Sequence, residues 1–305
     1  MSPDVSDLDI ERDLAVPTSV PRKKRMMLTV LTGVSAGKVF ALDDSDVFWF
    51  GRGLTVDLAF EDVGVSREHA RLTRREDGRW VFEDLGSTNG SFVGGELVVV
   101  PVELRAGDRI QLGPTVLLRF AVVDDTEIEL LRRLYESSTR DALTGLYNRQ
   151  HFQERLLTEV AYAKRHSAEL ALLMLDIDRF RRINDEHGHL IGDLILRAVC
   201  TQIVRVVRTE DLVVRWGGEE IVVLARATRK NAAGRLADRI RGSIGGLAVH
   251  SAQVREPLSV TVSIGVAVQS ELRPGASEDE LVKLADQRLR QAKDAGRNRV
   301  VLETP

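Results

Sequence analysis

The sequence of 305 residues predicts two domains of different fold class, an all-β sandwich followed by an α/β domain. Three observations support this. Short β-rich runs broken by Gly and Asp fill the N-terminal part, apolar strands alternate with amphipathic helices in the C-terminal half, and a helical period separates the two. The length is also typical of two domains rather than one.

Composition divides the chain into four segments. Residues 1–25 are polar and show no period, so we expect a disordered tail. Residues 26–123 form the predicted sandwich, residues 124–140 a helical linker and residues 141–305 the α/β domain. In the linker Ile128, Leu131 and Tyr135 recur at helical spacing. This apolar stripe either packs on a neighbouring domain or forms a dimer seam.

Overall composition narrows the class of protein. The formal net charge of -3 gives no reason to expect a nucleic-acid partner. Cys200 is the single cysteine, which excludes a disulfide framework within one chain. No apolar run approaches the roughly 20 residues that span a bilayer, and the N-terminus does not resemble a signal peptide. We therefore expect a cytoplasmic protein that does not insert into membranes.

Two acidic clusters stand out in the C-terminal half. A buried-type strand in "LLMLDIDRF" ends at Asp176 and Asp178, which a period of two places on one face. The stretch "RWGGEEIVVL" brings Glu219 and Glu220 to a second strand after a glycine turn. If the two strand ends are neighbours, Asp176 and Glu219 could hold Mg²⁺, whose shell substrate phosphates often complete. Taken alone, either cluster is more typical of a solvated turn.

The C-terminal half resembles the GGDEF diguanylate cyclase family through five blocks in one order, "RDALTGLYNRQHF", "LDIDRFRRINDEHGHLIGD", "RTEDLVVRWGGEE", "VSIGVA" and "ADQRLRQAKDAGRN". The resemblance implies a central β-sheet flanked by helices, related to the palm of nucleotidyl cyclases and polymerases. It implies that Asp176, the carbonyl of Ile177 and Glu219 bind Mg²⁺ or Mn²⁺. Glu220 would be either a second metal ligand or the acceptor of the 3′-hydroxyl proton.

The same resemblance implies the substrate and its binding positions. Two GTP molecules would condense to cyclic di-GMP and two pyrophosphates, with each protomer of a homodimer holding one GTP. Asn184 and Asp193, the latter at the start of a helix, would read the guanine edge. Lys293 and Arg297, four apart and so on one helical face, would reach the terminal phosphates. The implied GTP positions are Phe180, Arg181, Asn184, Asp193, Gly217, Gly218, Lys293 and Arg297.

An inhibitory site for the product is also implied. Arg208 and Asp211 in "RTED" match the family's arginine and aspartate three residues apart, and Arg239 falls where the family has a secondary inhibitory arginine. An ordinary ion pair closing a helix is the alternative for Arg208 and Asp211. The sequence also departs from the family's usual pattern in the last helix, where Arg288 and Arg290 replace small and aromatic residues.

The N-terminal half resembles a forkhead-associated (FHA) domain through "FGRG", "VSREHARL", "DLGSTNGSFVGG" and "LRAGDRIQLG". The family is a β-sandwich whose loops bind phosphothreonine peptides, and His69 is structural in it. Arginine and hydroxyl donors on adjacent loops suit a dianionic phosphate. The implied phosphopeptide positions are Arg52, Ser66, Arg67, Thr88 and Asn89.

Together the motifs predict a diguanylate cyclase that is regulated by phosphothreonine recognition and by its product. Thr18, the tail's only threonine, is a candidate phosphosite for the FHA domain of the same chain or of a dimer partner; an inert linker is the alternative. A second reading of the whole chain is a catalytically silent cyclic di-GMP receptor and phosphopeptide scaffold. The metal-ligand residues favour the enzyme, because a receptor has no use for them.

Overall fold

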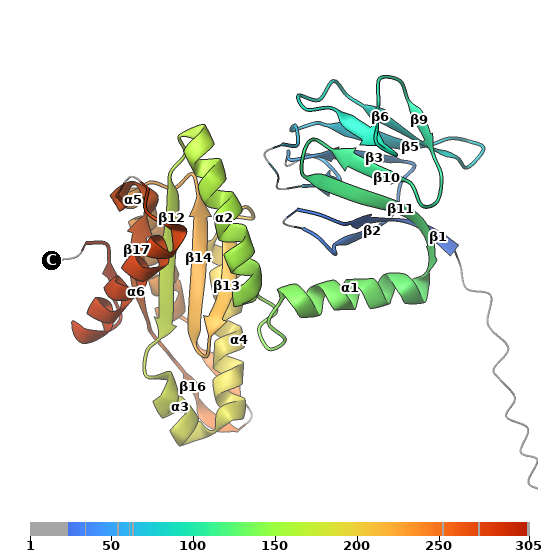
Figure 1. The fold of residues 1–305 in the computed structure, drawn as a ribbon. Coiled ribbons are helices and arrows are strands. Elements are labelled where there is room, and N and C mark those ends of the chain that lie inside the picture. Colours follow the sequence, from blue (N-terminus) through green and yellow to red (C-terminus); the bar gives the residue numbers. More distant parts are fainter. Residues whose placement is uncertain are drawn as a thin grey trace, which may run out of the picture.

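The computed structural model describes residues 24–303 apart from residues 34, 54, 61, 63, 252 and 274. Figure 1 shows a β-sandwich and an α/β domain joined by the helix α1 (Asp125–Thr139). The expected tail, including Thr18, lies outside the described residues except for its last two positions. These already belong to the first strand, β1 (Lys24–Val30), because Lys24 pairs with Asp124.

Two sheets form the sandwich (Figure 1). The first is antiparallel, and the second is mixed because two of its strands pair in parallel. Their facing side chains build one core, in which Phe50 lies stacked on Phe60 and edge-on to Phe82. The first sheet has the order β2 (Val39–Ala41), β1, β11 (Val116–Asp124), β10 (Arg109–Leu112), β7 (Ser91–Val93) and β8 (Glu96–Leu97). The second has the order β4 (Leu58–Ala59), β3 (Val47–Gly51), β5 (Ala70–Arg74), β6 (Trp80–Asp84) and β9 (Val102–Leu104).

Helix α1 packs against the sandwich by part of its apolar surface. Asp124 caps the helix by accepting from the Glu127 amide at 2.9 Å. Ile128 is buried against the sandwich, and Leu131 packs beside it. Leu130 and Leu134 are 55% exposed on other parts of the helix surface. The stripe therefore does pack on a neighbouring domain, which leaves two leucines uncovered within this chain.

One central sheet organises the C-terminal domain. Its strand order is β13 (Leu212–Gly217), β14 (Glu220–Arg226), β12 (Leu170–Ile177), β17 (Val262–Val268) and β18 (Val300–Val301). A separate hairpin is formed by β15 (Val249–Ser251) and β16 (Val254–Leu258), and a 3-10 turn, η1 (Gln269–Glu271), follows β17. The helices are α2 (Arg149–His166), α3 (Phe180–His187), α4 (His189–Val206), α5 (Lys230–Gly245) and α6 (Glu278–Asp294).

Strand β12 is buried on both faces, which is why its sequence is continuously apolar. Leu173 and Leu175 face the core that contains α4 and α5. Leu172 and Met174 face the opposite core, which contains α2 and α6. The sheet is thus covered on both sides, and polar chemistry is possible only where its strands end.

Gly265 fixes how closely α6 lies on the sheet. A Cβ atom at this position of β17 would lie 2.1 Å from the Ala285 carbonyl oxygen and 2.2 Å from the Leu289 nitrogen, both in the backbone of α6. Only glycine allows this approach. Because Lys293 lies one turn further along α6, the contact at Gly265 also sets the distance of Lys293 from the sheet.

Candidate active site

The two acidic clusters meet at one end of the central sheet. Asp176, at the end of β12, is paired in register with Glu220, at the start of β14. Glu219 precedes Glu220 in the turn between β13 and β14, and it is half-buried. Asp176 is only 6% exposed. The two strand ends are therefore neighbours, as the metal-site hypothesis requires.

Negative charge is crowded at this position. Burial, together with a smaller effect of the nearby carboxylates of Glu219 and Glu220, raises the pKa of Asp176 to about 6. Lys293 acts in the opposite direction, with its Nζ 2.6 Å from Asp176 Oδ2. One ammonium thus pairs with one of three neighbouring carboxylates, an arrangement that favours an additional cation.

The donor set fits a hard divalent cation. Carboxylate oxygens and a main-chain carbonyl are the ligands that Mg²⁺ and Mn²⁺ take, and their like charges disfavour the site when it has no cation. Asp176, Glu219 and the Ile177 carbonyl supply such oxygens at one strand end. Within the described residues no group of three or more His, Cys, Asp or Glu side chains is already arranged around a metal position. A metal-bound phosphate would have to complete the shell.

The glycine turn leaves its outer side open. Gly218 has a φ of +49°, and an added Cβ at Gly217 or Gly218 would meet no atom within 4 Å. Arg215 holds the turn, because its Nε donates to the Gly218 carbonyl at 3.0 Å and its Nη1 donates to both oxygens of Asp141 at 3.0 Å. Arg215 and Asp141 both lie in the family blocks, but no local pattern in the sequence indicates that they contact each other.

Asn184 and Asp193 belong to the paired helices α3 and α4. A Cβ at Gly192 would lie 1.8 Å from Asn184 Oδ1, so Asn184 occupies the space above Gly192, next to Asp193 in the chain. The expected helix start at Asp193 is too late, because Gly188, with a φ of 82°, ends α3 and α4 begins at His189. Two further GTP candidates, Phe180 and Arg181, have opposite environments. Phe180 is buried in the core, whereas the Arg181 side chain is 93% exposed.

The shared helical face that we expected for Lys293 and Arg297 is wrong. Helix α6 ends at Asp294, and Gly296, with a φ of 110°, turns the chain away from the helix. Arg297 is an exposed loop residue with a φ of 63°. Its Nη1 lies 3.5 Å from the Lys293 carbonyl, so the two residues are still neighbours.

Arg208 and Asp211 line a cavity of about 290 Å³ beside Arg140 and Tyr147. Asp211 Oδ2 accepts from the main-chain amide of Arg208 at 3.0 Å. Burial raises the pKa of Asp211, although the amides of Arg208 and Arg226 lower it. In the part of the chain that the structure describes, no ion pair joins the Arg208 guanidinium to Asp211. An ordinary ion pair therefore does not explain this motif.

Arg239 does not line that cavity. Its Nη2 donates to the Val206 carbonyl at 2.8 Å, at the end of α4. The guanidinium of Arg140 lies over the Tyr147 ring at 4.4 Å and forms part of the cavity wall instead. Tyr147 and Arg140 both line the cavity, although we did not predict a role for either from the sequence.

The predicted phosphopeptide residues of the sandwich come from three loops that contact one another. The Arg52 amide donates to the Ser66 carbonyl at 2.9 Å, and the Thr88 amide donates to Ser66 Oγ at 3.1 Å. Arg52 Nε is buried and has no hydrogen-bond partner among the described residues. Arg67 is exposed. The Ser66 and Thr88 hydroxyls lie 3.4 Å apart where these loops meet, and hydroxyl and guanidinium donors together suit an anion.

Two further residues connect these loops. Asn89 Nδ2 donates to the Gly64 carbonyl at 2.9 Å, so in this structure its side chain joins loops. His69 is fully buried and accepts from the Ser66 amide through Nδ1 at 2.9 Å. Burial lowers the pKa of His69, which keeps the ring neutral. Both contacts fix Ser66 relative to Thr88.

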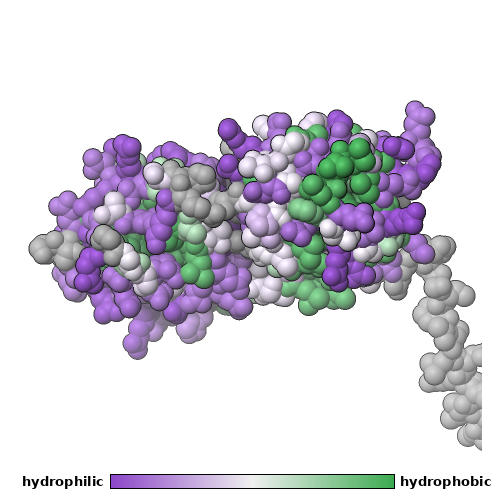
Figure 2. Space-filling view, turned by 45° about the horizontal axis from the view of Figure 1, so that its top comes forward, coloured by the Kyte–Doolittle hydropathy of each residue, from purple (hydrophilic) through white to green (hydrophobic). Residues whose placement is uncertain are grey.

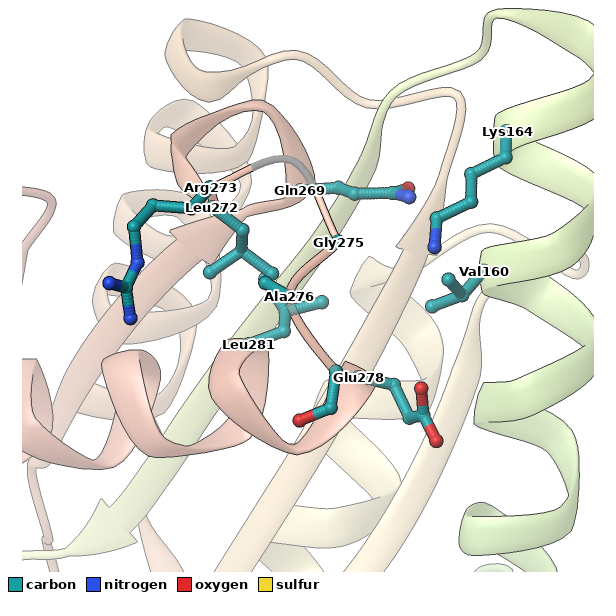
Figure 3. Close-up of a pocket in the computed structure, with 10 residues that line it drawn as sticks. Val160, Lys164, Gln269, Leu272, Arg273, Gly275, Ala276, Glu278 and Leu281 are labelled. Carbon is teal, nitrogen blue, oxygen red and sulfur yellow. The ribbon is translucent and has the colours of Figure 1, made fainter.

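A second cavity, of about 170 Å³, lies far from the acidic cluster, between α2 and the segment joining η1 to α6 (Figure 3). Lys164 and Gln269 project toward its interior. It contains none of the predicted site residues, so the acidic strand ends remain the candidate for catalysis.

The surface differs between the two domains. Figure 2 shows apolar side chains gathered on the sandwich half, whereas the visible face of the α/β half is mainly hydrophilic. On the sandwich, Leu97, Val99 and Val100 are 54%, 79% and 66% exposed. Among the described residues, no helix has both the length and the apolar character that a membrane crossing requires.

Comparison with known proteins agrees with both resemblances. The family model for the diguanylate cyclase GGDEF domain matches residues 138–299, and the model for the FHA domain matches residues 48–113. The diguanylate cyclase DgcP of Pseudomonas aeruginosa is 41% identical over 54% of this chain and 24% of its own length. The response regulator PleD of Caulobacter vibrioides is 41% identical over 54% of this chain and 36% of its own length.

A solved structure supports the fold of the C-terminal domain. The GGDEF domain of DgcB from Caulobacter crescentus, in complex with c-di-GMP, is 32% identical and superposes with a TM-score of 0.51 over 54% of this chain and 95% of that chain. By contrast, this chain spans only about a quarter to a third of the curated relatives named above. Because the GGDEF model matches more than half of the sequence, the chain belongs to the GGDEF diguanylate cyclase family and carries an FHA domain before it.

Proposed function

We propose that the C-terminal domain condenses two GTP molecules into cyclic di-GMP with release of two pyrophosphates. The observation that carries this proposal is the register pair of Asp176 and Glu220, with Glu219 beside it and Lys293 in contact with Asp176. Structural carboxylates are normally paired one to one with cations. Here three carboxylates lie close together beside an open glycine turn, and among the described residues Lys293 pairs with Asp176 alone, which favours a metal-bound triphosphate as the missing partner.

Asp176, Glu219 and the Ile177 carbonyl would hold the divalent cation. When bound, it would lower the pKa of the attacking 3′-hydroxyl and neutralise charge on the phosphate oxygens. Lys293 and Arg297 would bind the terminal phosphates, and Glu220 would accept the hydroxyl proton or bind a second cation. Asn184 and Asp193 would hold the guanine edge. The open sides of Gly217 and Gly218 leave room for the phosphates.

The reaction joins two nucleotides, and one acidic cluster per chain would hold one of them. The 3′-oxygen of one GTP attacks the α-phosphorus of the other in line. Two copies of the chain must therefore place their clusters face to face, so the proposed active form is a homodimer. The specific activity should therefore rise with protein concentration as the dimer forms.

The test is incubation of the purified chain with GTP and Mg²⁺, followed by chromatographic detection of cyclic di-GMP. The matched control is Glu220→Gln, which keeps the size of the side chain and removes its charge. We expect product from the wild type and none from the control. Absence of product with tight binding of cyclic di-GMP would instead favour the silent receptor.

We further propose that the cavity at Arg208 and Asp211 binds the product and inhibits the enzyme. Its support is the size of the cavity, the exposed Arg208 side chain, whose Nη1 lies 3.9 Å from Glu210 Oε1, and the partly buried Asp211. A guanidinium and a carboxylate together can read a guanine edge and a phosphate. Arg208→Ala should abolish inhibition by added cyclic di-GMP without lowering the initial rate of product formation; unchanged inhibition would contradict this role.

For the FHA domain we propose phosphothreonine recognition by Arg52, Ser66, Arg67 and Thr88, with Asn89 shaping the loop. The support is the pair of Ser66 and Thr88 hydroxyls, 3.4 Å apart, on loops that the Arg52 amide also joins. A peptide of the tail sequence phosphorylated at Thr18 is a suitable first probe. Binding that is lost in Arg52→Ala and in the unphosphorylated peptide would support the proposal. Failure of phosphothreonine peptides to bind the wild type would contradict it.

A further inference from the structure

Asp178 is the carboxylate of the "LDID" stretch that the proposed reaction leaves without a role. It lies one residue beyond the end of β12 and is 7% exposed. Three donors reach its carboxylate: Thr261 Oγ1 and Ser263 Oγ at 2.6 Å each, and the Asn298 main-chain amide at 3.0 Å. The Asp178 amide also donates to the Thr261 carbonyl at 2.9 Å.

These contacts distinguish the Asp178 carboxylate from that of Asp176, two residues earlier in the chain. Asp176 has Lys293 on one oxygen and other carboxylates nearby, whereas both oxygens of Asp178 accept hydrogen bonds from the protein itself. A carboxylate with three donors is held firmly in place. Asp178 therefore connects the end of β12 to the start of β17 and to the loop that follows α6.

That loop has an unusual backbone. Gly296, Arg297 and Asn298 have φ values of 110°, 63° and 46°, so three consecutive residues occupy the left-handed region. For Arg297 and Asn298, which carry a Cβ atom, this conformation is unfavourable and persists only where other contacts hold it.

Several hydrogen bonds hold the loop, and its next residue is tied to β17, because the Arg299 carbonyl accepts from the Ile264 amide at 2.9 Å. The Asn298 amide donates to Asp178, Asn298 Oδ1 accepts from Arg241 Nη1 at 3.1 Å, and the Arg297 amide donates to the Ala292 carbonyl at 3.0 Å. Only the first connects the loop to the strand that carries Asp176. Without it the loop would keep its contacts to α5, α6 and β17 but lose its direct link to the end of β12, beside the acidic cluster.

We propose that Asp178 is a positioning residue that sets the direction in which Arg297 points, and so the enzyme's preference for a triphosphate. Asp178 acts through the Asn298 amide, one residue after Arg297, and does not touch the nucleotide. The proposal rests on the proposed function, since the contact of Arg297 with the terminal phosphates comes from there. Loss of Asp178 should weaken binding of the terminal phosphates and leave the guanine site intact.

The experiment measures binding by calorimetry to the full chain with Mg²⁺, using guanosine 5′-(β,γ-imido)triphosphate and GMP as probes. Asp178→Asn, Arg297→Ala and the double variant are compared with the wild type. Asp286→Asn is the matched control, because it removes a carboxylate that pairs only with Arg290 on the surface of α6. Melting temperatures establish that each variant is folded.

We expect Asp178→Asn to weaken triphosphate binding about tenfold, which corresponds to 1.4 kcal/mol, and to change GMP binding by less than about twofold. The double variant should bind the triphosphate within about twofold of Arg297→Ala alone, because both changes remove one interaction. The control should match the wild type. If Asp178→Asn does not fold, Thr261→Val with Ser263→Ala removes two anchors of the carboxylate and should give the same selective loss.

Three results would overturn the proposal: equal weakening of both nucleotides, unchanged triphosphate binding, or additive losses in the double variant. If the proposed function were wrong, the binding data would differ from these three results. In that case the wild type would not prefer the triphosphate over GMP, or Arg297→Ala would leave the preference unchanged. A preference that Arg297→Ala abolishes and Asp178→Asn retains would overturn the role of Asp178 alone.

Discussion

Carboxylates at the two ends of the central sheet have opposite electrostatic environments, and α6 contacts both ends. At one end Lys293 reaches Asp176, whose pKa is raised to about 6, chiefly by burial. At the other end Arg288 reaches Glu271 with both guanidinium nitrogens, at 2.7 and 2.9 Å, and also donates to the Val266 carbonyl. Burial alone would raise the pKa of Glu271, but hydrogen bonds from Arg288 and Lys230 lower it to about 2.

This difference is the one that we expect between a structural site and the proposed catalytic site. Around Glu271, two cations satisfy one carboxylate, so its charge stabilises the fold. Around Asp176, three carboxylates lie close together and one lysine pairs with Asp176, so their mutual repulsion lowers stability and favours a bound cation. Catalytic sites commonly sacrifice stability in this way. Each prediction below changes one end and measures whether activity or stability responds.

The largest effect is expected for Lys293→Met. This change removes the proposed phosphate contact and leaves Asp176 buried without its only ion-pair partner among the described residues. Turnover of GTP should fall by roughly 10²–10³-fold, in the range found when a preorganised charge is removed from an active site. Steady-state kinetics with GTP and Mg²⁺ would measure it. Activity within a few fold of wild type would show that the lysine serves only to neutralise Asp176.

Arg288→Leu should act on stability and not on turnover. Arg288 is 5% exposed, and its loss leaves Glu271 partly buried with Lys230 as the remaining cation. Breaking a buried pair from one side destabilises by roughly 3–5 kcal/mol. Urea unfolding gives the change in free energy, and the same preparation below its melting temperature should make product normally. The double change Arg288→Leu with Glu271→Leu should recover much of the loss.

Acid should weaken the Glu271 end. Because the pKa of Glu271 is lower in the folded state than its ordinary value of 4.5, its contribution is complete above about pH 4.5 and is lost as pH falls toward 2. The contribution amounts to roughly 2–3 kcal/mol after allowance for its partial exposure. The free-energy difference between wild type and Glu271→Gln should therefore shrink between pH 6 and pH 3. A constant difference would contradict the assigned pKa.

The smallest effect is expected for Glu303→Gln. Glu303 is the outer partner of Lys230 at 3.2 Å, and its side chain is 80% exposed. Exposed ion pairs contribute little, so unfolding free energy should change by less than about 0.5 kcal/mol. A loss as large as that of Arg288→Leu would mean that the network acts as a unit and not through its buried members.

Much of this architecture could be predicted from local pattern. The alternation of apolar runs and helical periods gave both fold classes, and the strand-end positions of Asp176 and Glu220 followed from their runs. One wrong prediction depended on a partner distant in the chain, and the other on a local turn. Lys24 is a strand residue because it pairs with Asp124, and Arg297 leaves the helix because Gly296 turns the backbone. A helical spacing rule cannot detect where a helix ends.

The buried polar residues were the hardest to assign. Arg288 appeared only as a departure from a usual small residue, and its partner Glu271 is 17 positions earlier, in a short turn. Asp178 looked equivalent to Asp176 by period, yet its donors Thr261 and Asn298 lie 83 and 120 positions away. Such contacts follow from the packing of β17 and α6 and not from any local signal.

The central claim is that the Asp176 end carries activity at the expense of stability, whereas the Glu271 end carries stability alone. The most direct test measures GTP turnover and melting temperature side by side for Asp176→Asn and Arg288→Leu. We predict that Asp176→Asn abolishes cyclic di-GMP formation with an unchanged or higher melting temperature. Arg288→Leu should lower the melting temperature and keep turnover. Asp176→Asn protein that still makes product, or that melts as early as Arg288→Leu, would contradict the account.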